Sequence, residues 1–150
     1  MEIRTILLPT DFSPWAEHAC QQGFALAVRE HAHVLLVHVL LRSDLAFGDI
    51  PFPMREQAEK GLQAEAESRL RTLAAGQSVP VETLVVWGSP PVEICRIAQE
   101  RHVDLIVMST HGHTGLAHLL IGSVAERVVR HAPCSVLIVR PTMPQEAPSS

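Results

Sequence analysis

Short apolar runs alternate with longer stretches of helical spacing along this sequence. The apolar runs are typical of strands covered on both faces, and they occupy residues 5–8, 34–41, 81–87, 105–108 and 135–139. The stretches with helical spacing are residues 14–31, 54–75, the segment that follows Pro90, and 123–130. Such alternation predicts one α/β domain, a doubly wound and mostly parallel sheet of five strands with four helices on its two faces.

The expected helices have apolar faces that would cover the sheet. The inward residues of the first helix are Cys20, Phe24, Ala27 and Val28. Those of the clearest amphipathic helix, residues 54–75, are Leu62, Ala66, Leu70 and Leu73. Those of the third are Ile94, Cys95 and Ala98. Gly76 is suited to the C-terminal end of the second helix, and residues 42–53 before it are expected to form a long loop.

Residues 105–123 combine an apolar run, a glycine-containing loop and a helix start. Gly112 and Gly115 fall in the loop, and Gly122 directly precedes Ser123, where the helical pattern begins. Glycine lets the backbone approach an anion closely, and the free N–H groups and dipole of a helix N-terminus favour negative charge. The stretch therefore predicts a phosphate or nucleotide site. The alternative is that these glycines only turn the chain.

A second polar loop follows the first expected strand. Pro9, Thr10 and Asp11 come directly after that strand, and Thr10, Asp11 and Ser13 offer side-chain oxygens that could cap the next helix. Ligands of open parallel sheets bind at the carboxyl ends of the strands, where the strand order reverses. If the first and fourth strands are neighbours, this loop and the one after Met108 face each other across one crevice.

The charge of the chain excludes some classes of function. A net charge of −4 and a pI near 6.1 argue against a general nucleic-acid surface. Lys60 is the only lysine among the 12 basic residues, and the chain has no P-loop motif, which needs a lysine against the phosphates. No GxSxG nucleophile motif is present either. We therefore expect binding or sensing with at most slow hydrolysis of a bound nucleotide, and no catalytic residue is assigned.

The same survey bears on location, redox state and metals. No secretion signal and no apolar run of about 20 residues is found, so we expect a cytoplasmic protein without membrane contact. The cysteines, Cys20, Cys95 and Cys134, are isolated and are expected to be buried free thiols.

Nine histidines raise the question of a metal site. The close pairs are His31 with His33 and His111 with His113, and neither has a third ligand at a suitable spacing. We expect the first pair to face solvent and the second to contact phosphate or its counter-ion, with no dedicated metal site.

Several motifs, in order, carry a resemblance to a known family. They are LLPTDFS at 7–13, VHV at 37–39, DLIVMSTHG at 104–112, GSVAERV at 122–128 and HAPCSVLIV at 131–139. On these motifs the chain resembles the universal stress protein family, specifically its ATP-binding branch, over about residues 1–140. That branch carries the pattern Gly-x2-Gly-x9-Gly-Ser/Thr. Gly112, Gly122 and Ser123 fit it, whereas Ser109 stands where the first glycine is expected.

The resemblance implies a nucleotide site and its residues. It implies that Pro9, Thr10 and Asp11 hold the ribose side and that the backbone of Val39 lies against adenine. It implies that Gly112, Gly122, Ser123 and Val124 cradle the phosphates through backbone N–H groups and the serine hydroxyl. The other candidate nucleotide-binding residues of the same stretch are Met108, Ser109, His111 and Gly115. The implied cofactor is ATP, with Mg or Mn carried by its phosphates.

The resemblance also implies a strand order of 3-2-1-4-5 and a homodimer, formed in many members by pairing of the last strand, here residues 136–139. Protein partners are unknown, and residues 141–150 are expected to form a disordered tail.

The implied function is that of a nucleotide-dependent stress-response regulator or sensor. The alternative is a dimeric scaffold that does not bind nucleotide, which Ser109 supports. A role like that of electron-transfer flavoproteins would rest on fold analogy alone. Apolar residues near the long loop, Phe47, Ile50, Phe52 and Met54, are expected either to close over adenine or to join a dimer contact.

Overall fold

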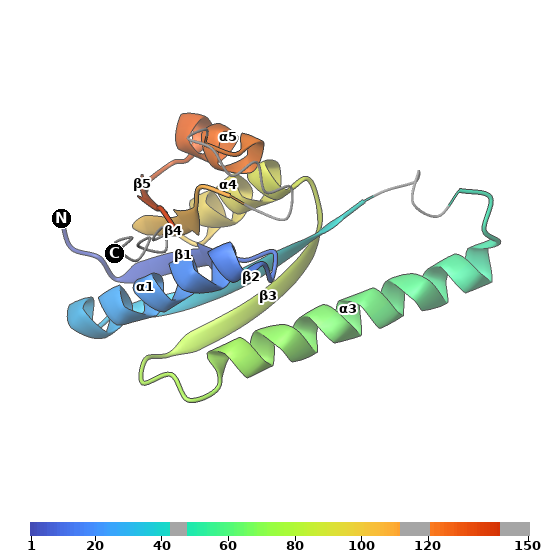
Figure 1. Cartoon of the computed structure of the whole chain (residues 1–150), viewed down its shortest axis with the longest axis horizontal. Coiled ribbons are helices and arrows are strands. Elements are labelled where there is room, and N and C mark those ends of the chain that lie inside the picture. The colour runs from blue at the N-terminus through green and yellow to red at the C-terminus, as the bar shows by residue number, and fades with distance from the viewer. Residues whose placement is uncertain (43–47, 112–120, 142–150) are drawn as a thin grey trace, which may run out of the picture.

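The computed structural model describes residues 1–42, 48–111 and 121–141. It contains one parallel sheet made of β1 (Thr5–Pro9), β2 (His33–Leu41), β3 (Val81–Gly88), β4 (Leu105–Ser109) and β5 (Ser135–Val139). The order across this 5-stranded sheet is β3-β2-β1-β4-β5, so β1 is central and β3 and β5 are the edges (Figure 1). The predicted fold class and strand order are confirmed. The expected tail lies almost wholly outside the described residues.

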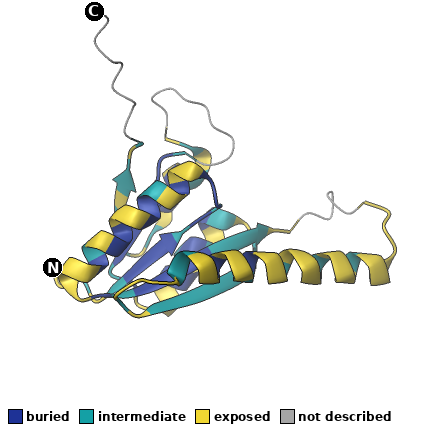
Figure 2. Cartoon of the chain, turned by 60° about the horizontal axis from the view of Figure 1, so that its bottom comes forward, coloured by how far each residue is buried: buried dark blue, intermediate teal, exposed yellow. Residues whose placement is uncertain are grey.

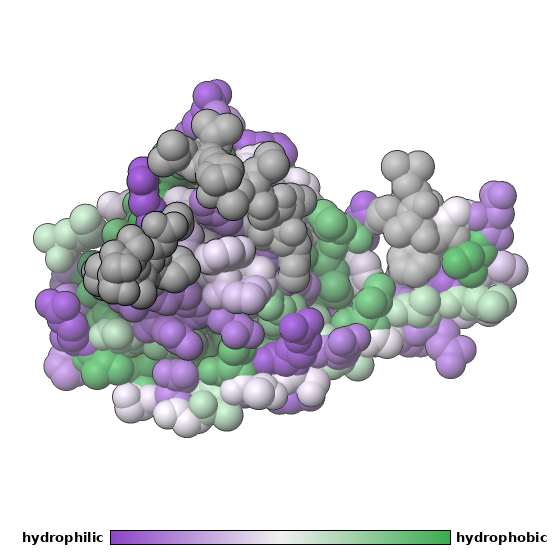
Figure 3. Space-filling view, viewed as in Figure 1, coloured by the Kyte–Doolittle hydropathy of each residue, from purple (hydrophilic) through white to green (hydrophobic). Residues whose placement is uncertain are grey.

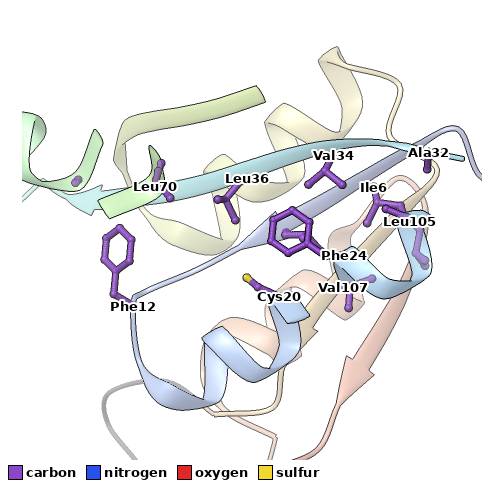
Figure 4. Packing of buried hydrophobic residues seen from close by; sticks show 13 residues of the cluster. Ile6, Phe12, Cys20, Phe24, Ala32, Val34, Leu36, Leu70, Leu105 and Val107 are labelled. Carbon is purple, nitrogen blue, oxygen red and sulfur yellow. The ribbon is translucent and has the colours of Figure 1, made fainter. Parts of the chain in front are cut away.

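The helices of the described residues are α1 (Pro14–Glu30), α3 (Phe52–Ala74), α4 (Pro90–Glu100) and α5 (Ser123–His131). Helices α1 and α3 cover one face of the sheet, where Phe24 and Leu70 belong to one buried cluster (Figure 4). Helices α4 and α5 cover the other face, where Ile97 and Val128 belong to a second cluster. The sheet is therefore enclosed between two helical layers.

Strand β1 contributes to both clusters because successive side chains of a strand point to opposite faces. Ile6 and Leu8 pack in the cluster under α1 and α3, whereas Leu7 packs in the cluster under α4 and α5. All three side chains are fully buried. The apolar run thus forms the centre of the fold, as Figure 2 shows by its burial.

Helix α3 differs from the prediction at its N-terminal end. It begins at Phe52, inside the expected loop, and Pro53 in its first turn suits a helix start, because the N–H that proline lacks has no intrahelical partner there. Its buried residues are Ala66 and Leu70, whereas Leu62 is 41% exposed. Only the C-terminal half lies against the sheet, and the N-terminal half projects beyond the strands (Figures 1 and 2). The expected burial of Leu62 was wrong for this reason.

Two smaller corrections concern side chains near helix faces. Cys20, Phe24 and Ala27 are buried in α1, but Val28 is exposed, because it is about 100° further round the helix than Ala27. All three cysteines are free thiols, as expected. Cys20 is buried, whereas Cys95 and Cys134 are only half-buried at the margin of the second cluster.

Within the described ranges, no helix has the length and apolar character needed to cross a membrane.

Candidate functional site

The two polar loops that the sequence singled out follow the carboxyl ends of β1 and β4, so they leave the sheet on the same side. Strands β1 and β4 pair in parallel, with Ile6 opposite Leu105 and Leu7 opposite Ile106. Strand β2 lies on the other side of β1, so the chain order reverses between β1 and β4. The condition for the two loops to lie next to each other is met, at the position where open parallel sheets bind ligands.

Thr10 organises the first loop from inside. Its N–H donates to the carbonyl of Val37 at 2.8 Å, and its hydroxyl oxygen accepts the N–H of Phe12 at 3.0 Å. His38 Nδ1 lies 2.7 Å from the carbonyl oxygen of Thr10. Because a carbonyl only accepts, Nδ1 carries the proton. Thr10 is only 5% exposed, so its polar groups serve the loop.

Asp11 is the half-buried member of this loop and comes directly after Thr10. Its Oδ1 accepts the N–H of Ser13 at 2.9 Å. Ser13 is the N-cap of α1 and accepts the N–H of Ala16 at 3.2 Å. The expectation that this segment caps helix one is therefore confirmed for Ser13, while Asp11 supports the cap from the loop.

Phe12 has a backbone conformation that is rare for an aromatic residue. Its φ is +65°, in the left-handed region, which costs on the order of 1–3 kcal/mol and persists only where the surroundings hold it. Its ring centroid lies 4.4 Å from that of His38, and the guanidinium carbon of Arg69 lies 4.2 Å from the ring centroid. These contacts hold the strained turn in place beside Asp11.

Val39 lies at the end of β2 that extends past β1. The pairing of β1 with β2 ends at Pro9 opposite Val37. The carbonyl of Val37 faces β1, where it accepts from Thr10, and backbone groups two residues further along a strand face the same side. The N–H and C=O of Val39 thus point past the end of β1, on the side of the Thr10–Asp11 loop, where the resemblance places adenine.

Three buried residues lead into the second loop: Met108 and Ser109 at the end of β4, and Thr110 directly after it. The hydroxyl oxygen of Ser109 accepts the N–H of His111 at 3.2 Å. The hydroxyl oxygen of Thr110 lies 2.6 Å from Nδ1 of His111. Both side chains therefore fix His111 at the end of β4, and the serine that replaces the motif's glycine contributes to this.

His111 has a buried atom without a partner. Among the described residues, its Nε2 is the one buried side-chain nitrogen or oxygen that makes no hydrogen bond. If the hydroxyl of Thr110 donates to Nδ1, the neutral ring carries its proton on Nε2, which is then a donor without an acceptor. A buried donor of this kind costs about 1–3 kcal/mol unless an acceptor arrives, so the site suits a ligand with acceptor oxygens.

Gly122 and the first turn of α5 form the second part of the candidate phosphate site, and they come after residues 112–120 in the chain. Its N–H donates to the carbonyl of Thr110 at 2.7 Å, and a β-carbon on Gly122 would lie 2.8 Å from the same oxygen. Gly122 is the N-cap of α5, and no side chain of the described residues caps this helix. As far as the described residues go, the N–H groups of Ser123 and Val124 in the first turn are thus left for an anion, and the helix dipole favours one.

The candidate site residues that the structure describes lie together at the carboxyl ends of the strands. They lie after β1, at the end of β2, at the end of β4 and at the start of α5: Pro9, Thr10, Asp11, Val39, Met108, Ser109, His111, Gly122, Ser123 and Val124. Gly112 and Gly115 lie outside the described residues, as does His113. Arg127 and Arg130 of α5 are exposed, and Arg130 pairs with Glu126.

Sequence reasoning missed His38, the main side-chain partner of the first loop. The available signal was a polar residue inside an apolar strand, between Val37 and Val39. It also missed Trp15, whose ring centroid lies 6.4 Å from that of His111. In the described part of the chain, no three histidine, cysteine or acidic side chains are grouped so that they could hold a metal ion.

Comparisons with known proteins identify the family of this chain. The model of the universal stress protein family matches residues 2–140. The chain belongs to the universal stress protein family. A universal stress protein of Methanocaldococcus jannaschii, MJ0531, is 31% identical over 144 residues, which cover 91% of this chain and 82% of the relative.

Solved structures share the fold. MJ0577 of the same archaeon superposes with a TM-score of 0.85 at 29% identity, covering 96% of this universal stress protein and 100% of that chain. A universal stress protein from Archaeoglobus fulgidus, solved in complex with dAMP, has a TM-score of 0.58 at 22% identity and covers 92% and 98% of the two chains.

Proposed function

We propose that this universal stress protein belongs to the ATP-binding branch and acts as a nucleotide-dependent stress-response regulator or sensor. The observation that carries the proposal is the unpartnered Nε2 of His111 beside the uncapped N-terminus of α5. Thr110 holds both, through its hydroxyl and its carbonyl. A phosphate chain would supply acceptor oxygens to the histidine and negative charge to the helix.

The other candidates take the rest of the nucleotide. Asp11 follows the buried Thr10 and would accept from ribose hydroxyls, while the backbone of Val39 would lie against adenine. The dAMP complex of the Archaeoglobus protein supports an adenine nucleotide on this fold. Mg or Mn would arrive with the phosphates, since the described residues offer no cluster of their own.

We propose weak or no turnover. Lys60, the only lysine, is exposed on α3 and pairs with Glu56, far along the chain from the phosphate loop. Arg130 pairs with Glu126 on the surface of α5. Phosphoryl transfer needs cations against the β- and γ-phosphates, and no described side chain is placed for that role. The state of the bound nucleotide is then the signal.

The proposed assembly is a homodimer through β5, in a cytoplasmic protein. Strand β5 is an edge of the sheet, and its Leu137 is 44% exposed. An unpaired apolar edge favours pairing with a second copy.

The test is a titration of the purified protein with Mg-ATP, preceded by native mass spectrometry to detect co-purified nucleotide. We expect one ATP per subunit, and loss of binding in Gly122→Val, whose side chain would meet the carbonyl of Thr110. Gly61→Ala is the matched control, because nothing lies within 4 Å of a β-carbon there.

A second variant tests the histidine. His111→Phe keeps an aromatic ring near Trp15 and removes Nε2, so we expect weaker binding without loss of fold. A wild-type protein whose dissociation constant for Mg-ATP is millimolar or higher would refute the proposal and favour the dimeric scaffold. Retained affinity in Gly122→Val would place the phosphate site elsewhere.

A further inference from the structure

Helix α3 reaches the nucleotide-site loop through Phe12. The guanidinium carbon of Arg69 lies 4.2 Å from the centroid of the Phe12 ring, the arrangement of a cation–π contact. Leu70, the next residue of α3, belongs with Phe12 to the same buried cluster, and Figure 4 shows their side chains near each other. Phe12 therefore joins α3 to the segment that contains Thr10 and Asp11.

The strained backbone of Phe12 makes this contact consequential. A φ of +65° is unfavourable for a phenylalanine, so the turn depends on what holds the ring and the N–H. The N–H is held by the hydroxyl of Thr10, and the ring by His38 and Arg69. Asp11 comes immediately before this turn, so its place depends on the same contacts.

Helix α3 packs on the sheet near Arg69 and projects beyond the sheet at its other end. Its buried residues, Ala66 and Leu70, flank Arg69 closely, and both lie in the C-terminal half. The N-terminal half of α3 projects beyond the sheet (Figure 1), and the space-filling view shows the same projection carrying both hydrophilic and hydrophobic side chains (Figure 3). Arg69 therefore lies on the same continuous helix as a segment that is open to other molecules.

We propose that Arg69 is a positioning residue that couples the seating of α3 on the sheet to ligand binding at the Thr10–Asp11 loop. The inference rests on the proposed nucleotide site and adds its regulation. Coupling is reciprocal: if seated α3 favours the binding-competent loop, bound nucleotide favours seated α3 by the same factor. The nucleotide state is then presented on the projecting half of α3.

The experiment compares Mg-ATP affinity in three variants. Arg69→Met keeps the length of the side chain and removes its charge, so we expect the dissociation constant to rise roughly two- to fivefold, the size of an exposed cation–π contact. Arg69→Lys keeps a cation and should restore most of the affinity. Arg71→Met is the matched control, since Arg71 is exposed on the same helix and about 200° further round it.

A second measurement separates coupling from a general loss of stability. Hydrogen exchange of the amides of residues 66–74 is followed with and without Mg-ATP. We expect ATP to slow exchange there in the wild type and in Arg71→Met, and to have little effect in Arg69→Met.

Four results overturn the inference. Equal affinity in the wild type and Arg69→Met would show that Arg69 does not position the loop. Equal weakening in Arg71→Met would show that the effect is not specific to Arg69, and exchange of α3 that ignores ATP would show that α3 is not coupled to the site. Wild-type protein that binds no nucleotide would instead refute the proposed function, and the coupling with it.

Discussion

Gly23 of α1 lies directly against Leu8 of β1. A β-carbon on Gly23 would overlap Cδ2 of Leu8 and lie 3.1 Å from its Cδ1. Leu8 is fully buried, so its side chain can move aside only by displacing the residues packed around it. We expect Gly23→Ala to destabilise the fold by about 1–3 kcal/mol, although alanine is the better helix former, because overpacking of a filled core outweighs propensity. Urea unfolding followed by circular dichroism measures this, and a variant as stable as the wild type would contradict it.

Gly61 should respond to the same substitution in the opposite direction. It lies inside α3 on an exposed face, and nothing is within 4 Å of the position of a β-carbon. Gly61→Ala then adds only helix propensity, which stabilises by about 0.5–1 kcal/mol. A rise in the midpoint of thermal unfolding checks the sign. If Gly61→Ala were destabilising, a contact of α3 that the structure does not show would be implied.

Much of the fold could be predicted because local pattern and global arrangement agree. The apolar runs at 5–8 and 105–108 became β1 and β4, and the start of α5 at Ser123 follows directly from the pattern. Periodicity shows which face of a helix is apolar, but not how far the sheet beneath it extends. Leu62 is exposed for that reason, while Ala66 and Leu70 on the same helix are buried.

The site could be predicted only in part. Glycine and polar residues after strands indicated which loops matter, and pairing of β1 with β4 brought those loops together. The contacts of His38 with Thr10 and Phe12 depend on the register of β1 against β2, which a single sequence does not reveal. The unpartnered Nε2 of His111 likewise depends on which atoms of other segments fail to reach it.

Asp104 links β1 and β4 where these two strands begin, at the end of the sheet opposite the candidate site. Its Oδ2 accepts the N–H groups of Arg4 and Thr5, each at 2.9 Å. Asp104→Ala leaves both donors without this acceptor, and we expect a loss of about 1–2 kcal/mol of stability because one of them is partly buried. Glu100→Ala serves as a control, since its pair with Arg96 is on the surface. Equal stability of the two variants in urea would contradict the prediction.

The proposed dimer can be tested at Leu137. Leu137→Glu places a charge on the exposed edge strand, where it should hinder pairing with a second copy and shift the protein toward monomer. Val92→Glu is the matched control, because Val92 is 51% exposed on α4, away from that edge. Size-exclusion chromatography with light scattering gives the mass. A wild-type monomer, or a Leu137→Glu variant that remains fully dimeric, would refute pairing through β5.

The buried thiol of Cys20 predicts a specific response to alkaline pH. Burial, followed by the nearby charge of Glu17, raises the pKa of the Cys20 thiol from 9.0 to about 12. In the unfolded chain the thiol ionises near the lower value, so the stabilisation is complete below pH 9 and is lost as the pH rises toward about 12. We expect Cys20→Ala to flatten the loss of stability above pH 9, although it lowers stability at neutral pH by leaving a small cavity.

Thiol labelling of the native protein at pH 8 should modify the half-buried Cys95 and Cys134 well before Cys20, because the thiolate is the reactive form. Rapid labelling of Cys20 in the folded state would show that α1 opens from the sheet more readily than its packing against Leu8 implies.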